Sequence, residues 1–282
     1  MPCSWINGKL VDESKAVLSI FDRSYLYGEG IFETLRCYGG KPAFLDRHYQ
    51  RLRQNSRRLQ IPLTLSEKDL RFAIGRLLKK NKMKEAVVRA TVSLQGATFG
   101  VEIPKDPKVN LTLFCRPAAL DPRLFEAGVK VFCSQNLIND SPGVADIKAT
   151  SYLTKMLARA EAAKAGAYET LLKNAKGNWA EGSRTNLFVV LDRTVITPPL
   201  SEGILNGITR QVVLEILKEK KMAHREAPIT DLMLNNAEEI FLTGSTSEVM
   251  PVGEVIGMII RKTGPFPLAK TLRLEYRRTL GI

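Results

Sequence analysis

Residues that bind transition metals are scarce in this sequence of 282 residues. There are two histidines and four widely spaced cysteines, namely His48, His224, Cys3, Cys37, Cys115 and Cys133. No two cysteines have the CxxC spacing of zinc and redox motifs, which excludes such a motif as the basis of function. We therefore expect no metal cofactor and mostly structural, reduced thiols.

Long apolar runs are also missing. No stretch approaches the roughly twenty consecutive apolar residues that a membrane-spanning helix needs. The first residues, Met1 to Gly8, contain no basic region followed by an apolar run, as a secretory leader would. These absences predict a cytoplasmic protein.

Acidic residues are fewer than basic ones, 29 against 42, and the formal net charge is +13. Such a charge could serve a nucleic acid, a membrane surface or an anionic substrate. The basic residues are nevertheless spread through amphipathic segments such as 47–58 and 79–84, which is typical of solvated helix faces. This distribution argues against a nucleic-acid-binding module. The hydrophobic fraction of 44% is ample for a globular core.

The first third of the chain contains clear turn and helix signals. Asn7-Gly8 and Gly39-Gly40 each separate short apolar runs, which predicts two hairpins because these residues tolerate positive φ. A helical apolar pattern follows the second hairpin over residues 45–59. Ser66 and Asp69 have the spacing of a capping box ahead of a second helical pattern.

Residues 87–94 alternate between apolar side chains and the polar series Arg89, Thr91 and Ser93. This period of two predicts a strand with one polar face. Residues 109–115 predict another strand. Together with the preceding elements, these strands indicate a small N-terminal α/β domain over residues 1–116.

Residues 117–128 contain two prolines and no strong period, and they predict a linker ahead of a larger domain at 129–282. Patterns in that domain predict strands near 129–134, 168–173, 185–190 and 238–243, and helices near 151–165, 208–221 and 266–280. Strands come in runs with helices between the runs. We therefore predict an α+β fold rather than a regular doubly wound parallel sheet.

Lys148 stands at a junction between a loop rich in serine, proline and glycine and an apolar helical pattern containing Leu153, Met156 and Leu157. Most lysines are exposed surface residues, and that is the ordinary interpretation of Lys148 taken alone. A functional role for Lys148 can be inferred only together with other segments of the chain.

Three of these segments are polar and adjoin apolar elements. Glu181 opens a polar turn ahead of an apolar strand, where a carboxylate is ordinarily a turn residue. Gly207 and Thr209 open an amphipathic helix, either as a plain cap or as N–H groups that face an anion. Ser245 and Thr246 lie in a hydroxyl-rich turn after a buried strand, which is a simple turn or a second phosphate site.

In combination and in this order, the segments resemble the class IV, or fold-type IV, aminotransferases. The resemblance rests on Asp22 to Arg36, Arg51 in His-Tyr-Gln-Arg-Leu, Lys148, Glu181-Gly-Ser with Asn186-Leu-Phe, Gly207-Ile-Thr, and Thr243-Gly-Ser-Thr-Ser-Glu-Val. It spans nearly the whole chain. The family includes branched-chain aminotransferases, D-amino-acid aminotransferases and aminodeoxychorismate lyases. The resemblance implies two domains, a barrel-like sheet in the larger one, and pyridoxal 5′-phosphate as cofactor.

The resemblance also implies roles for individual residues. Lys148 would hold the cofactor as a Schiff base and later move a proton. Glu181 would face the pyridine nitrogen and keep it protonated, so that the ring withdraws electrons strongly. Guanidinium, helix N–H and hydroxyl groups would bind the phosphate, from Arg51, Gly207, Ile208, Thr209, Ser245 and Thr246. Tyr152 would hydrogen-bond the cofactor's phenolic oxygen, with core packing as an equal alternative.

Three residues of the small domain are candidates for binding the substrate. Arg89 lies where branched-chain enzymes carry an arginine that faces the cofactor, the alternative being an arginine paired with solvent. Arg36 is the next candidate for the substrate carboxylate. Phe32 occupies a position where D-amino-acid enzymes carry a tyrosine, and this departure disfavours that activity.

We therefore expect an aminotransferase that moves an amino group from a small, mostly apolar amino acid to a 2-oxo acid such as 2-oxoglutarate. We also expect a homodimer or higher homo-oligomer, with no nucleic-acid or membrane partner. The alternatives in the same family are an aminodeoxychorismate lyase, using the same Lys148 and Glu181 to eliminate pyruvate, and a D-amino-acid aminotransferase. A nucleic-acid-binding protein would explain the charge but none of the motifs.

Overall fold

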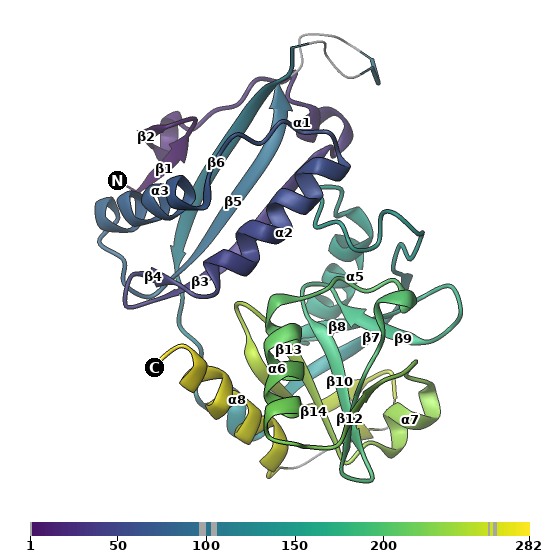
Figure 1. Cartoon of the computed structure of the whole chain (residues 1–282). Coiled ribbons are helices and arrows are strands. Elements are labelled where there is room, and N and C mark those ends of the chain that lie inside the picture. Colours follow the sequence, from purple (N-terminus) through teal and green to yellow (C-terminus); the bar gives the residue numbers. More distant parts are fainter. Residues whose placement is uncertain (1, 96–99, 103–105, 259, 262–263) are drawn as a thin grey trace. The chain divides into compact units, whose positions relative to one another are not determined.

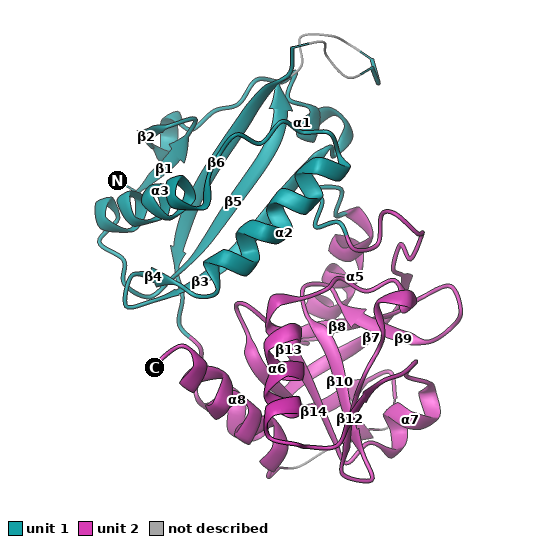
Figure 2. Ribbon diagram, in the orientation of Figure 1, with its two compact units in different colours: residues 1–119, 147–152 teal, residues 120–146, 153–282 magenta. Residues whose placement is uncertain are grey.

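A computed structural model describes residues 2–95, 100–102, 106–258, 260–261 and 264–282. The chain divides into two compact units, each described here by itself (Figure 2). Unit 1 contains residues 1–119 and 147–152, and unit 2 contains residues 120–146 and 153–282.

Unit 1 contains a six-stranded antiparallel sheet in the order β2-β1-β6-β5-β3-β4. Its strands are β1 (Cys3–Ile6), β2 (Lys9–Asp12), β3 (Gly30–Tyr38), β4 (Lys41–Pro42), β5 (Ala86–Gln95) and β6 (Lys108–Pro117). The two expected hairpins are present as β1–β2 and β3–β4. All four of their turn residues, Asn7, Gly8, Gly39 and Gly40, have positive φ, as the sequence predicted.

Two helices, α2 (Leu45–Arg58) and α3 (Glu67–Lys80), cover one face of this sheet (Figure 1). Their leucines and isoleucines pack against the inward side chains of β3 and β5. The capping box of α3 is present, because Ser66 Oγ accepts from Asp69 N and Asp69 Oδ2 accepts from Ser66 N. The short elements η1 (Glu13–Lys15) and α1 (Arg23–Tyr27) had no clear signal in the sequence.

The opposite face of the sheet carries polar side chains. Val88, Ala90, Val92 and Leu94 of β5 are fully buried, whereas Arg89 and Thr91 are partly exposed, as the alternation predicted. Thr34 of β3 lies opposite Arg89, and Phe32 lies opposite Thr91. Because directly opposed residues of antiparallel strands project to the same side, these four side chains share one face.

The division of the chain differs from the predicted boundaries at residues 147–152, which lie with unit 1 and not with the rest of 129–282. Ala149 forms a β-bridge with Ile31, and Phe32 N donates to Lys148 O over 3.0 Å. Thr150 N donates to Gly30 O over 2.8 Å. These contacts join residues far apart in the chain, so local sequence patterns do not report them.

Unit 2 is built on a nine-stranded sheet in which six strands form a closed ring. The ring runs β10-β13-β14-β7-β8-β9 and closes because β9 also pairs with β10. The strands of unit 2 are β7 (Val129–Leu137), β8 (Glu169–Lys173), β9 (Trp179–Gly182), β10 (Asn186–Leu191), β11 (Thr194–Thr197), β12 (His224–Glu226), β13 (Glu239–Gly244), β14 (Glu248–Ile256) and β15 (Ile260–Arg261). The barrel-like sheet expected for the larger domain is therefore confirmed.

The helices of unit 2 are α4 (Arg123–Ala127), α5 (Leu153–Lys164), η2 (Leu200–Glu202), α6 (Ile208–Glu219), α7 (Asp231–Asn236) and α8 (Pro267–Thr279). Helix α5 packs on β7 and β8, while α6 and α8 pack on each other and on β13 and β14 (Figure 1). Three of these helices, α5, α6 and α8, lie within the predicted ranges. None of the helices in the described ranges is both long and apolar enough to cross a membrane.

Candidate active site

The backbone of residues 148–150 holds Lys148 beside β3 of unit 1. Two main-chain hydrogen bonds and a β-bridge join this segment to residues 30–32. The side chain is half-buried, and its Nζ lies 4.7 Å from the centroid of the Phe32 ring. The amine is therefore held over an aromatic side chain and is not extended into solvent.

Gly30 permits this close approach. A Cβ added there would lie 2.8 Å from Ser24 Cβ and 3.0 Å from Thr150 Oγ1. Any larger residue would push Thr150 away from β3, because the contacting groups are not the ends of long, flexible side chains. The position of Lys148 therefore depends on the glycine at the start of β3.

Two other predicted residues, Arg89 and Tyr152, gather with Lys148 around Phe32. The guanidinium carbon of Arg89 lies 3.5 Å from the centroid of the Phe32 ring, and the ring of Tyr152 lies 5.7 Å from it in a T-shaped arrangement. Burial lowers the pKa of Arg89, although Tyr152 opposes the effect. Among the residues that the structure describes, no carboxylate forms an ion pair with Arg89. This guanidinium is therefore suited to an anionic ligand.

Arg36 lies on β3, the strand that carries Phe32, and it already has an acidic neighbour. Its Nη2 is 2.9 Å from Glu85 Oε2, and its guanidinium stacks on Tyr38. Its Nε and Nη1 are buried and have no hydrogen-bond partner within the described part of the chain. Arg36 therefore remains the second candidate for a substrate carboxylate, after Arg89.

Arg51 is part of a buried cluster that the sequence did not predict. Its Nε and Nη2 donate to the two carboxylate oxygens of Glu33 over 2.8 and 2.7 Å, and His48 Nδ1 lies 2.7 Å from Glu33 Oε2. Burial raises the pKa of Glu33, but Arg51 and then His48 outweigh it and lower the pKa to about 2. The Nε and Nη2 edge of the Arg51 guanidinium is therefore engaged by Glu33.

The Glu33 cluster predicts a specific loss of stability in acid. Folding lowers the pKa of Glu33 from an ordinary value of 4.5 to about 2. The ionised carboxylate therefore contributes fully to the free energy of unfolding above pH 4.5, and this contribution is lost as the pH falls to about 2. That interval corresponds to roughly 3 kcal/mol. Unfolding free energies measured between pH 6 and pH 2 should therefore show the advantage of the wild type over Glu33→Gln narrowing by about this amount. A gap that does not change with pH would contradict the cluster.

Glu181 is the predicted carboxylate of the site, and it lies in unit 2. It is buried on β9, and its Oε2 accepts hydrogen bonds from Leu205 N (3.0 Å) and from Asn186 Nδ2 (3.2 Å). Its Oε1 is 2.7 Å from Lys155 Nζ. These donors fix the orientation of the carboxylate, with Oε2 held by neutral groups and Oε1 turned toward a cation.

The start of α6 lies against the Glu181 site. Gly207 is the N-cap, no side chain caps the helix, and Ile208 and Thr209 are buried. A Cβ at Gly207 would overlap Oδ1 of Asn186, the amide that also bonds Glu181. The glycine therefore lets the helix terminus approach Asn186, with backbone N–H groups suited to an anion.

A hydroxyl-rich turn extends this region. Thr243 lies directly opposite Asn186 in the β10–β13 pairing, and its Oγ1 is buried with no hydrogen-bond partner within the described ranges. Ser245 and Thr246 follow in the turn between β13 and β14, and both are partly exposed. The turn therefore adds hydroxyl groups next to the strand that carries Asn186.

These groups have the chemistry that pyridoxal 5′-phosphate requires. Each unit by itself contains such groups: unit 1 has the Lys148 amine, which could react with the cofactor's aldehyde, and unit 2 has the buried Glu181 carboxylate, which could face a ring nitrogen. The uncapped α6 and the buried Thr243 hydroxyl provide donors for a phosphate. The residues present therefore fit the cofactor, and among described residues no group of three His, Cys, Asp or Glu side chains could hold a metal.

Sequence reasoning missed Glu33 and Lys155. Glu33 lies on the buried face of β3, where a charged residue between Ile31 and Leu35 signals a partner. Lys155 had no such signal, because a lysine in an amphipathic helix is ordinarily exposed. Asn186 and Thr243 were recognised as parts of motifs, but the sequence did not indicate their contacts.

Comparison with known proteins agrees with this geometry. Residues 30–255 match the family model for class IV aminotransferases. The chain is 33% identical over 279 residues to a putative branched-chain-amino-acid aminotransferase of Methanocaldococcus jannaschii, covering 97% of this chain and 94% of that one. It is 30% identical over 251 residues to an aminodeoxychorismate lyase of Bacillus subtilis, covering 89% and 86%.

Solved structures give the same result. The Escherichia coli branched-chain amino acid aminotransferase matches with a TM-score of 0.90 and 26% identity over 98% of this chain and 93% of that one. Another branched-chain amino acid aminotransferase, solved with pyridoxamine 5′-phosphate, matches with a TM-score of 0.88 and 28% identity over 98% and 92%. The chain therefore belongs to the class IV aminotransferases, which are enzymes that depend on pyridoxal 5′-phosphate.

Proposed function

We propose that this enzyme moves an amino group from a small, mostly apolar amino acid of the branched-chain type to a 2-oxo acid such as 2-oxoglutarate. The carrying observation is Arg89, a partly buried guanidinium stacked on Phe32 with no carboxylate paired to it among the described residues. A substrate carboxylate would supply the missing negative charge. The branched-chain aminotransferases similar to this chain support the choice of an apolar side chain.

Lys148 and Glu181 carry the chemistry in this proposal. Pyridoxal 5′-phosphate, when bound, supplies an aldehyde that combines with amines and a ring that withdraws electrons. The Lys148 amine would bind the cofactor covalently and, once released, would move the proton at the substrate's Cα. Glu181 would hold the proton of the ring nitrogen at its Oε1, because Oε2 is already oriented by Leu205 N and Asn186.

The phosphate would be bound mainly by main-chain and hydroxyl groups. We place it at the N–H groups of Ile208 and Thr209 after Gly207. The hydroxyls of Ser245 and Thr246 would contribute from the turn after β13, the strand that pairs with β10 and its Asn186. Arg51 would contribute its guanidinium, and Tyr152 would bind the phenolic oxygen.

The runner-up function is an aminodeoxychorismate lyase, which the Bacillus subtilis relative favours. Two assays separate the alternatives. Purified holoenzyme with leucine and 2-oxoglutarate should form glutamate, whereas with aminodeoxychorismate it should release neither 4-aminobenzoate nor pyruvate. Release of 4-aminobenzoate without glutamate formation would replace the transaminase proposal by the lyase.

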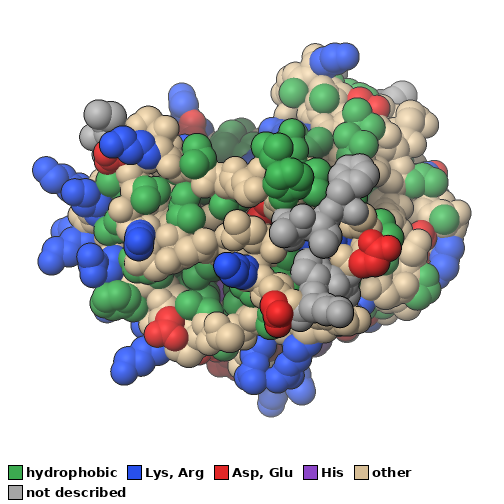
Figure 3. Space-filling model, turned by 90° about the horizontal axis from the view of Figure 1, so that it is seen from above, with side chains coloured by type: hydrophobic (Ala, Val, Ile, Leu, Met, Phe, Trp, Pro, Cys, Tyr) green, Lys and Arg blue, Asp and Glu red, His purple; other side chains and the backbone are tan. Residues whose placement is uncertain are grey.

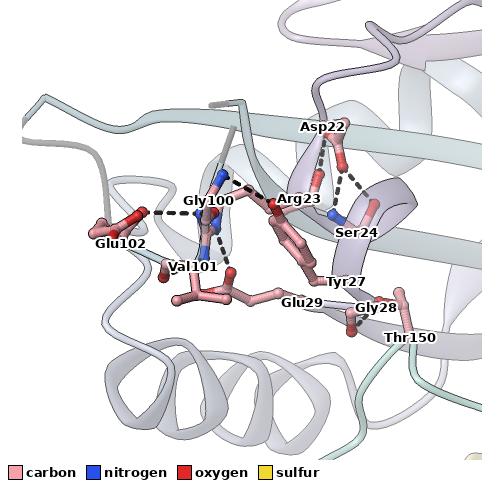
Figure 4. A network of polar contacts seen from close by, with 11 residues as sticks. Asp22, Arg23, Ser24, Tyr27, Gly28, Glu29, Gly100, Val101, Glu102 and Thr150 are labelled. Carbon is pink, nitrogen blue, oxygen red and sulfur yellow. Dashed lines mark hydrogen bonds and ion pairs between the residues drawn. The ribbon is translucent and has the colours of Figure 1, made fainter. Parts of the chain in front are cut away.

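A homodimer is part of the proposal, and the contacts of residues 100–102 in unit 1 support it (Figure 4). Arg23 donates to the carbonyl oxygens of Gly100, Val101 and Glu102, and Tyr27 Oη accepts from Gly100 N. Val101 is nevertheless 77% exposed. An exposed apolar side chain on a backbone fixed by hydrogen bonds is typical of a surface that another protein covers.

A buried carboxylate fixes the start of α1, the helix to which Arg23 belongs. Asp22 is fully buried and accepts from Ser24 N, Ser93 Oγ and Asn110 Nδ2 over 2.9, 2.7 and 2.6 Å. Arg23 also forms an ion pair with Glu29. The α1 segment is therefore anchored to β5 and β6, and through Arg23 it holds the backbone of residues 100–102.

We predict that sedimentation will give twice the chain mass of 31.4 kDa, or a multiple of it. Val101→Asp should weaken the assembly by at least about tenfold, because it buries a charge in an apolar contact. Phe72→Asp is the matched control, since Phe72 is also an exposed apolar residue (58%) and belongs to α3, which lies away from residues 100–102 within unit 1 (Figure 1). A fully active wild-type monomer would contradict the proposal.

The net charge does not favour a nucleic acid as partner. On the face drawn in Figure 3, lysine and arginine side chains form several separate groups, with hydrophobic and acidic side chains between them. We propose small anionic substrates instead, and a cytoplasmic location. All four cysteines are free thiols, which suits a reducing compartment.

A further inference from the structure

Lys155 is a second lysine directed at the candidate cofactor site. It lies in the first turn of α5, and its side chain is 22% exposed. Its Nζ is 2.7 Å from Oε1 of Glu181, whose side chain is 4% exposed. Neither the expected roles of the family residues nor the proposed mechanism uses this amine.

Helix stability does not account for Lys155. A cation in the first turn of a helix meets the positive end of the helix dipole, which is unfavourable. Helix α5 has no acidic residue in its first turn to offset that charge. The favourable interaction of Lys155 is therefore with Glu181 of β9, and not with another residue of α5.

The other hydrogen-bond partners of Glu181 are neutral groups. Leu205 N and Asn186 Nδ2, which bond Oε2, carry no net charge. Lys173 on the adjoining strand β8 instead pairs with Asp231 and lies over the Trp179 ring. Within the described residues, Lys155 is thus the one charged side chain bonded to Glu181.

The two oxygens of Glu181 are therefore unequal. Oε2 already accepts two hydrogen bonds, so a ring N–H would have to approach Oε1, where Lys155 is bound. Two cationic donors at one oxygen repel each other and share its negative charge. A carboxylate shared in this way holds a ring proton less firmly than one that serves the ring alone.

We propose that Lys155 acts through Glu181 as a positioning residue that weakens the carboxylate's hold on the proton of the cofactor's ring nitrogen. This inference rests on the proposed function. Lys155 thereby limits how strongly the ring withdraws electrons, and it gives the site a cation that competes with the protonated ring.

The test is the pH at which the ring nitrogen of bound cofactor loses its proton, measured by NMR on holoenzyme loaded with ring-¹⁵N-labelled pyridoxal 5′-phosphate. Lys155→Met should raise that pH by at least about one unit, because the competing charge is gone. Lys155→Gln keeps a hydrogen-bond donor without charge and should show the same shift. Lys155→Arg keeps the charge and should behave as the wild type.

Lys164→Met is the matched control, because Lys164 ends the same helix, is exposed, and carries the same charge. It should leave the ring nitrogen unchanged. An unchanged value in both Lys155→Met and Lys155→Gln would overturn the inference, as would a shift of equal size in Lys164→Met.

Glu181→Gln separates failure of the inference from failure of the proposed function. It should lower the pH of proton loss if Glu181 faces the ring nitrogen. If Glu181→Gln has this effect and the Lys155 variants do not, only the inference fails. If Glu181→Gln has no effect, Glu181 is not at the ring nitrogen and the proposed cofactor site fails with it.

Discussion

Replacement of Lys148 by alanine is expected to leave a folded protein whose rate of transamination falls on the order of a thousandfold. The side chain supplies both the amine that would hold the cofactor and the base that would move the substrate's proton. The fold should persist, because residues 148–150 are joined to β3 through their main chain. Glutamate formation in steady state gives the rate, and circular dichroism checks the fold.

Lys164→Ala is the control for this experiment, since it removes a lysine from an exposed position at the end of α5. It should retain wild-type activity. A folded Lys148→Ala enzyme that kept a tenth or more of the wild-type rate would show that another group performs both roles.

Replacement of Arg89 by alanine is expected to raise KM for the amino donor by roughly thirtyfold or more, with little effect on cofactor binding. A lost contact between buried charges costs about 2 kcal/mol or more, which corresponds to that factor. A guanidinium binds a carboxylate through two parallel hydrogen bonds, so Arg89→Lys should recover only part of the affinity. Initial rates over a range of leucine concentrations measure the effect.

Two controls make the Arg89 result specific. Arg71→Ala removes an exposed arginine that pairs with Glu67 on α3, and it should leave KM unchanged. The absorbance of bound cofactor should be the same in Arg89→Ala and the wild type. If Arg89→Ala keeps the wild-type KM for every donor, the carboxylate is bound elsewhere, and Arg36 or the turn at Ser245 becomes the next candidate.

Local signals in the sequence were sufficient for most individual elements. The Asn7-Gly8 and Gly39-Gly40 turns predicted hairpins because they require positive φ, and Ser66 with Asp69 predicted the start of α3. The alternation of residues 87–94 also placed Arg89 on the polar face of β5. Each of these signals lies within a few residues of the feature that it predicts.

Features that depend on contacts between residues far apart in the chain could not be predicted from local sequence patterns. The ring of unit 2 closes through the pairing of Asn186 with Glu181, and Lys148 is placed by bonds to β3. The apolar residues that predicted α5 are also misleading about burial, since Leu153 and Met156 are exposed. Its buried side consists of small residues such as Ala158, which carry a weak hydrophobic signal.

The charged contacts of the site show the same limit. A pattern could place Arg51 on a helix beside the core, but the bidentate bond to Glu33 joins two elements. Lys155 and Glu181 are likewise brought together by the packing of α5 on the barrel. Residue types with the right chemistry could be named from sequence, whereas the partners that set their charges required the fold.

Borohydride reduction of the wild-type holoenzyme, followed by peptide mapping with mass spectrometry, tests the central claim most directly. Reduction fixes the cofactor permanently to whichever lysine carries it. We predict that the phosphopyridoxyl group will be found on the peptide containing Lys148. A group on Lys155, or on any other lysine with Lys148 unmodified, would contradict the account.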